Sequence, residues 1–188
     1  MLNKKGQPIR TLNQFLDPKK ILEQLDIQEG EIVADFGCGS GYFTFPVAKM
    51  IGENGLVYAV DVQKSVISAI ESKMSFLGIR NVKPVWANLE ILGSTKIEKE
   101  SVDIVLLVKI LYQSNKHKEI FEETKRVLKS KGTLLILDWK KTEAPMGPKI
   151  SLRIAKDQIK KEAEEAGFKF IRELEADSYH YALVFSKS

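Results

Sequence analysis

The chain has few of the residues that metal and disulfide chemistry require. Its 188 residues include one cysteine, Cys38, and two histidines. A single cysteine cannot form an internal disulfide, and no cluster of cysteines or histidines has the spacing of a zinc or iron–sulfur site. We therefore expect no metal centre and a reducing compartment.

Long hydrophobic runs are also lacking. Apolar segments such as 102–108 are far shorter than the ~20 residues that cross a bilayer as a helix. Residues 1–16 are polar and do not contain the apolar stretch of a secretory signal. These absences predict no membrane insertion and a cytoplasmic location.

Neither sign of charge dominates. The chain has 29 Lys and Arg residues and 25 Asp and Glu residues, with a formal net charge of +4. Because acidic residues are interspersed among the basic ones, we expect a lysine-rich solvated surface. A basic face that binds RNA is the alternative.

No repeat, low-complexity stretch or linker divides the chain, so we expect a single domain over 1–188. Strand-like apolar segments occupy 31–36, 56–60, 82–85, 102–108, 133–138, 168–174 and 179–185. Helical spacing marks 42–51, 65–77, 116–129 (which we expect Gly132 to end) and 155–166. This alternation predicts a doubly wound, mostly parallel seven-stranded α/β sheet with a C-terminal antiparallel hairpin.

The most informative segment, residues 33–42 (VADFGCGSGY), carries three glycines between a predicted strand and a helix. Gly37, Gly39 and Gly41 permit positive φ angles and let a ligand approach the backbone. The loop follows the carboxyl end of the first strand, where open α/β sheets bind ligands. A ligand-binding loop is therefore expected here.

The spacing of these glycines narrows the kind of ligand. The pattern is G-x-G-x-G, whereas dinucleotide loops read G-x-G-x-x-G and phosphate loops end in Gly-Lys-Ser/Thr. Asp61 ends the second strand, 20 residues after Gly41. Its carboxylate can accept hydrogen bonds from both hydroxyls of a ribose, although it could also cap the next helix. Together these features predict a nucleoside ligand.

These segments resemble the class I S-adenosylmethionine-dependent methyltransferases from about Asp17 onward. The layout is similar to that of the small quinone-biosynthesis methyltransferases. The segments that carry the resemblance are 33–41 (VADFGCGSG), 58–62 (YAVDV), 87–89 (ANL), 101–108 (SVDIVLLV) and 126–137 (RVLKSKGTLLIL). The resemblance implies a Rossmann-like fold, S-adenosylmethionine as cofactor and S-adenosylhomocysteine as product.

The resemblance also implies the cofactor site. The glycine loop would line the methionine half, and Asp35 would orient that loop or meet the amino group. Asp61 would hold the ribose. The full set implied is Asp35, Gly37, Cys38, Gly39, Gly41, Asp61, Val62, Asn88, Leu89 and Lys109.

The adenine end depends on residues after the second and third strands. Val62 would pack on the base, and Asn88, beside Leu89, would face its edge. Many relatives carry Asp at the position of Asn88, but an amide can also donate and accept. Lys109, after the fourth strand, would border the methyl donor.

A sulfonium methyl is already activated, so the protein must mainly hold the acceptor in line with it. A base is needed only for a weakly nucleophilic acceptor. Tyr112 and His180 are the catalytic candidates, whereas His117 opens a lysine-rich helix and is expected to be solvated. Cys38 is poorly placed to attack a cytosine.

The acceptor is expected to be a small molecule. After residue 108 the chain reads Lys-Ile-Leu-Tyr, not the Asn/Asp-Pro-Pro-aromatic motif of enzymes that methylate amino groups of adenine or glutamine. Segments 1–16 and 139–154 are free to build the acceptor pocket, and the second, with its 145–148 Pro-Met-Gly-Pro run, could close as a lid. The alternatives are an RNA or ribosomal methyltransferase and a non-catalytic cofactor-binding partner subunit. The G-x-G-x-G spacing argues against an NAD-dependent oxidoreductase, and the sequence does not predict an oligomeric state.

Overall fold

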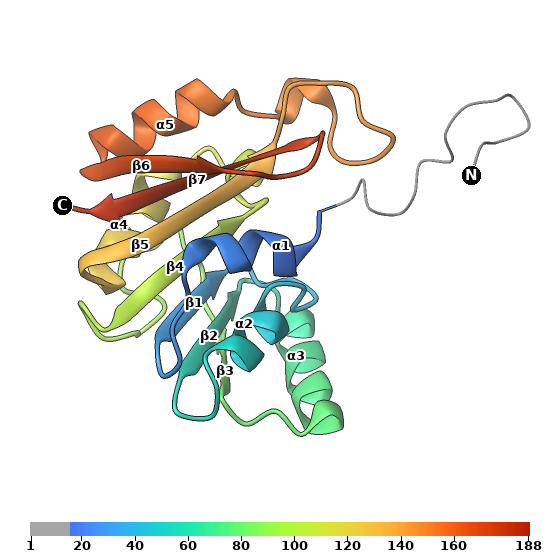
Figure 1. The fold of residues 1–188 in the computed structure, drawn as a ribbon, viewed down its shortest axis with the longest axis vertical. Helices are drawn as coiled ribbons and strands as arrows, with labels where there is room; N and C mark the ends of the chain where they lie inside the picture. Colours follow the sequence, from blue (N-terminus) through green and yellow to red (C-terminus); the bar gives the residue numbers. More distant parts are fainter. Residues whose placement is uncertain (1–15) are drawn as a thin grey trace, which may run out of the picture.

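The computed structural model describes residues 16–188, which form one seven-stranded sheet with helices on both faces (Figure 1). The strands are β1 (Ile32–Phe36), β2 (Leu56–Asp61), β3 (Val82–Trp86), β4 (Val102–Val108), β5 (Leu128–Trp139), β6 (Phe168–Leu174) and β7 (His180–Lys187). Their order is β3-β2-β1-β4-β5-β7-β6. Strands β1 to β5 are parallel, and β7 is antiparallel to both β5 and β6. The predicted fold is confirmed.

The helices form two layers, one on each face of the sheet, and each layer packs on its own hydrophobic core. The helices are α1 (Pro18–Leu22), α2 (Thr44–Met50), α3 (Lys64–Leu77), α4 (His117–Val127) and α5 (Lys156–Glu165), with short 3-10 turns η2 (Glu23–Leu25), η3 (Leu111–Gln113) and η4 (Ile150–Leu152). Ile21, Val47 and Ile70 bring α1 to α3 into one core. Phe121 and Ile159 bring α4 and α5 into the other. Figure 1 shows α1 in front of the sheet and α4 behind it.

The order of the strands creates the place where a ligand can bind. The chain passes from β1 outward to β2 and β3, and then returns to β4 on the other side of β1. At such a switch point the loops after β1 and β4 diverge to opposite faces and leave a crevice at the carboxyl ends of the strands. The glycine loop after β1 lies at this crevice.

One predicted boundary is wrong. We expected a helix over 116–129 that Gly132 ends, but α4 ends at Val127 and β5 begins at the next residue. The pairing of β5 with β4 shifts register between Val102 and Ile104, and Lys131 there has a φ of 64°. A Cβ on Gly132 would lie 2.9 Å from the Lys129 carbonyl oxygen, so the glycine serves a close backbone approach in a bulged strand.

Two further expectations concern membrane-spanning helices and the N-terminal arm. No helix within residues 16–188 is long and apolar enough to cross a membrane. The predicted N-terminal arm, 1–16, lies outside the described residues except for Leu16, which is buried and accepts a 2.8 Å hydrogen bond from the Tyr42 hydroxyl.

Candidate functional site

The glycine loop connects β1 to α2 in a conformation that requires its glycines. Gly37, Gly39 and Gly41 all have positive φ, at 78°, 49° and 76°. A Cβ on Gly41 would lie 2.3 Å from the ring of Phe45, so this glycine permits close packing. A Cβ on Gly39 would meet no atom within 4 Å, so the backbone there faces open space. The loop thus presents accessible backbone at its middle and is packed at its end.

Asp61 ties the glycine loop to the turn before α3. One carboxylate oxygen accepts the Gly39 N–H at 3.2 Å and the other accepts the Gln63 N–H at 2.9 Å. Gln63, not Asp61, is the N-cap residue of α3. Each oxygen of a carboxylate has a further lone pair, so Asp61 keeps acceptor capacity for a ligand.

Asp35 is a buried carboxylate beside the same loop. Its Oδ2 accepts a 2.6 Å hydrogen bond from the Thr44 hydroxyl at the start of α2. Burial raises the pKa of Asp35 to about 6, although the bonds from Thr44 act in the opposite direction. Burial, Asp35 and Asp61 also raise the pKa of the Cys38 thiol. A thiolate nucleophile is therefore disfavoured at Cys38.

A cavity of about 360 Å³ joins the glycine loop to residues from three other segments. It brings together six of the predicted site residues: Asp35, Gly37, Cys38, Gly39, Lys109 and Tyr112. Its wall also includes Tyr42, Phe43, Trp139, Gly147 and Pro148. Gly41, Asp61, Val62, Asn88 and Leu89 do not line it.

Lys109 places a cation at this cavity. Its backbone has a φ of 55°, and its N–H donates to the Leu137 carbonyl at 2.7 Å. Burial lowers the pKa of the ammonium, with Asp138 and Asp177 opposing that effect. The ammonium lies 6.0 Å from the centre of the Trp139 ring. Lys109 is therefore a partly desolvated charge next to an aromatic wall.

Trp139, at the carboxyl end of β5, is a site residue that the sequence analysis missed. Its ring contacts the His180 ring at a centroid distance of 4.0 Å, and the Arg153 guanidinium lies 5.1 Å from its centre. A Cβ on Gly147 would come 2.6 Å from the indole, so only a glycine fits above it. The sequence did offer one signal for Trp139: it directly follows a predicted strand, at the edge of the sheet where the glycine loop also lies.

The two catalytic candidates lie in different places. Tyr112 lines the cavity, and burial together with Asp138 raises its pKa, so the phenol stays protonated. His180 is 3% exposed and lies behind Trp139 rather than on the cavity wall. Its Nδ1 lies 2.8 and 2.9 Å from the two carboxylate oxygens of Asp177, whereas its Nε2 has no hydrogen-bond partner among residues 16–188.

His117 is not solvated, which corrects our expectation. Its Nδ1 lies 2.6 Å from a carboxylate oxygen of Glu162, and its Nε2 lies 2.9 Å from the Leu111 carbonyl oxygen. The ring therefore joins η3 to α5. A lysine-rich helix start does not show that a distant helix packs against it.

The loop 139–154 is held in place over the cavity by one arginine. Arg153 is buried, and its guanidinium donates to the carbonyls of Lys140, Thr142 and Pro148 at 3.1, 2.6 and 3.0 Å. Because three carbonyls converge on one side chain, the loop wraps around it. This places Gly147 and Pro148 on the cavity wall.

The predicted adenine side lies apart from the cavity. Val62 is 56% exposed directly after Asp61, which leaves its side chain free to meet a flat ligand. Asn88 and Leu89 follow β3; Leu89 packs in the core, and the Asn88 side chain accepts the Glu90 N–H at 3.0 Å. Among residues 16–188 no group of acidic, histidine or cysteine side chains could hold a metal ion.

Known proteins resemble this chain over most of its length. A family model described as a methyltransferase domain matches residues 27–180. An arsenite methyltransferase of Halobacterium salinarum is 27% identical over 76% of this chain and 38% of its own length. A ubiquinone/menaquinone biosynthesis C-methyltransferase of Marinomonas sp. is 29% identical over 85% of this chain and 61% of its own. The chain thus spans less than two thirds of either curated relative. A crystal structure of a SAM dependent methyltransferase from Aquifex aeolicus superposes with a TM-score of 0.87 at 28% identity, covering 93% of this chain and 92% of that one.

Proposed function

The chain belongs to the S-adenosylmethionine-dependent methyltransferases, and we propose that it transfers a methyl group by direct in-line displacement to a small-molecule acceptor. The observation that supports this most strongly is the 360 Å³ cavity shared by the glycine loop and the aromatic residues around Lys109. Its volume is within the range of small-molecule sites, roughly 300–1,000 Å³.

The residues around the glycine loop fit the cofactor. The open backbone at Gly39 leaves room for a ligand, and the exposed Val62 offers an apolar surface beside Asp61. We propose that Gly37, Cys38 and Gly39 border the methionine half, that Asp35 faces its amino group and that Asp61 accepts from the ribose hydroxyls. S-Adenosylmethionine supplies, when bound, a methyl group on a positively charged sulfur.

The protein's task is then to orient the acceptor and exclude water. Tyr42, Phe43, Tyr112 and Trp139 give the cavity aromatic walls, which favour a flat, unsaturated acceptor. The desolvated ammonium of Lys109 favours an acceptor with an anionic or strongly polarised oxygen. Because the raised pKa keeps the Tyr112 phenol protonated, this side chain is better suited to donate a hydrogen bond than to act as a base.

We further propose that residues 1–188 work as one methyltransferase domain in which the loop 139–154 closes over the acceptor. Support comes from Gly147 and Pro148 on the cavity wall and from the Arg153 clamp that holds the loop there. Limited proteolysis tests this idea. Cleavage within the loop should slow when cofactor product and acceptor are both present, and unchanged cleavage would argue against a lid.

Calorimetry tests the proposed function. S-Adenosylmethionine, S-adenosylhomocysteine and NAD are titrated into the purified protein, and micromolar binding of the first two alone is expected. Asp61→Asn should weaken that binding roughly tenfold or more, since a charged hydrogen bond is lost. Asp103→Asn is the matched control, because this carboxylate contacts Ile32 and Lys129 at the opposite end of the sheet. Binding of NAD instead, or of none of the three ligands, would contradict the proposal.

If the cofactor binds, a turnover assay then separates the acceptor classes: release of S-adenosylhomocysteine is measured with aromatic acceptors and with RNA. Binding without turnover on any of them favours a partner subunit.

A further inference from the structure

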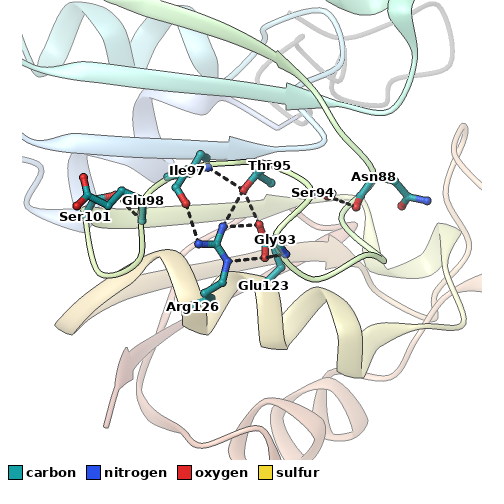
Figure 2. A network of polar contacts seen from close by, with 9 residues as sticks. All are labelled: Asn88, Gly93, Ser94, Thr95, Ile97, Glu98, Ser101, Glu123 and Arg126. Atoms are coloured by element: carbon teal, nitrogen blue, oxygen red, sulfur yellow. Dashed lines mark hydrogen bonds and ion pairs between the residues drawn. The ribbon is translucent and has the colours of Figure 1, made fainter.

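A partly buried ion pair lies beneath the segment that connects β3 to β4. Glu123 on α4 is 0% exposed, and Arg126 lies one turn further along the same helix. The Arg126 Nε and Nη2 atoms lie 2.8 Å from the two carboxylate oxygens of Glu123. Figure 2 shows both side chains reaching from the helix to the segment above it.

Three residues of that segment are bound to this pair. Glu123 accepts the Gly93 N–H at 2.7 Å and a hydrogen bond from the Thr95 hydroxyl. Arg126 donates to the Ile97 carbonyl at 2.7 Å and to the Thr95 hydroxyl oxygen at 3.1 Å. The pair therefore fixes the segment at three consecutive odd positions, 93, 95 and 97.

The fixed residues hold Asn88 in turn. Ser94, between two of them, donates from its hydroxyl to the Asn88 carbonyl at 2.5 Å, and the Ile91 N–H donates to the same carbonyl at 3.1 Å. In Figure 2 the Asn88 amide nitrogen points away from the network. The next residue, Leu89, is anchored in the hydrophobic core. Asn88 thus has a fixed backbone and a side chain directed outward.

The energetics favour a positional role for the pair. Burial alone would raise the pKa of Glu123, but hydrogen bonds from Arg126, Thr95 and Gly93 outweigh it and lower the pKa. A fully bonded buried pair is often no more stabilising than apolar residues of equal volume. What such a pair gives in addition is a single geometry, because each carboxylate oxygen of Glu123 accepts one hydrogen bond from Arg126 and one from the segment.

We propose that Glu123 and Arg126 are positioning residues that set Asn88 against the adenine of the bound cofactor. This inference rests on the proposed function, together with the adenine contact at Val62 and Asn88 that the family resemblance implies. It predicts that the pair changes cofactor affinity through the segment between β3 and β4. Neither this segment nor the two side chains line the 360 Å³ cavity.

The test is a calorimetric titration of S-adenosylhomocysteine into wild type, Glu123→Gln and the milder Thr95→Val. We expect Glu123→Gln to raise Kd about tenfold, and KM for S-adenosylmethionine to rise in parallel while kcat changes less than twofold. Amide exchange at Gly93 should also accelerate, because its carboxylate acceptor is lost. Lys129→Met is the matched control: it removes the 2.7 Å Lys129–Asp103 ion pair at the opposite end of the sheet and should leave Kd unchanged.

A double-mutant cycle with Asn88→Ala shows whether the effect passes through Asn88. We expect Glu123→Gln to add little to the loss caused by Asn88→Ala, because coupled residues are not additive. Full additivity, or a Glu123→Gln protein that unfolds more easily but binds with wild-type affinity, would overturn the inference alone. A wild-type protein that does not bind S-adenosylhomocysteine would overturn both it and the proposed function. If Glu123→Gln does not fold, the same cycle with Thr95→Val gives the decision.

Discussion

Replacing Asp35 by an asparagine should change how the stability of the protein depends on pH. The folded protein raises the pKa of Asp35 to about 6 from an ordinary value near 3.8. Between these two pH values the folded state holds a proton that the unfolded state has released, so the free energy of unfolding falls as pH rises. Integrated over the interval, the loss is roughly 3 kcal/mol, and it is complete above pH 6.

The Asp35→Asn variant lacks this loss. The amide oxygen of the introduced side chain can still accept from the Thr44 hydroxyl, which in the wild type lies 2.6 Å from a carboxylate oxygen. Urea unfolding of both proteins at pH 4.0, 5.0, 6.0 and 7.5 gives the difference in unfolding free energy. It should shift in favour of the variant by roughly 2.5 kcal/mol between pH 4.0 and pH 7.5, because a small part of the loss has already occurred at pH 4.0. Asp138, whose pKa is also raised to about 6, is present in both proteins and cancels in the difference.

The same carboxylate should show itself in ligand binding. If Asp35 faces the amino group of the cofactor, its charged form is needed, so S-adenosylhomocysteine should bind the wild type roughly tenfold more weakly below pH 6. Asp35→Asn should bind weakly at all of these pH values. A stability difference that does not change with pH would refute the reasoning about burial. A wild-type affinity that does not change with pH would refute the placement of the amino group.

Three further perturbations test other parts of the site. Gly41→Ala should lower the unfolding free energy by at least about 2 kcal/mol in a urea titration, because the added Cβ would lie 2.3 Å from Phe45. Gly39→Ala should cost less stability and mainly weaken cofactor binding, and equal losses of stability would contradict this contrast. Arg153→Met should speed tryptic cleavage within 140–152 several-fold, since three carbonyls lose their donor, and unchanged cleavage would show that other contacts hold the loop. Cys38 should react with a thiol reagent at least a hundredfold more slowly in the native protein than in urea, since its thiol is buried with a raised pKa; rapid native labelling would refute this.

The sequence predicted the features that depend on neighbouring residues. Seven strands, the glycine loop and the carboxylate of Asp61 are each encoded in a short stretch, because apolar runs, positive φ and the end of a strand have local signatures. The resemblance over 33–41 and 58–62 identified the cofactor. These predictions needed no knowledge of which strands are neighbours.

The missed features depend on contacts between distant segments. Trp139 belongs to the site because β7 places His180 beneath it and Gly147 lies above it. His117 is only partly exposed because α5 brings Glu162 to its ring. The end of α4 at Val127 is set by pairing of β5 with β4, which begins at once and overrides the helical pattern. Each depends on the spatial order of elements, which local periodicity does not contain.

The position of β7 has a consequence for the order in which the protein can fold. Within residues 16–188, strand β6 pairs with β7 alone. Strand β7 is synthesised after β6, and it also supplies the His180 that contacts Trp139. Until residues 180–187 emerge, β5 is therefore an open edge, β6 has no partner and the aromatic wall of the cavity lacks its support. A nascent chain that stalls before this point exposes two unpaired strand edges, the kind of surface that chaperones bind. The aromatic wall at Trp139 therefore gains its support from His180 only after β7 has been inserted beside β5.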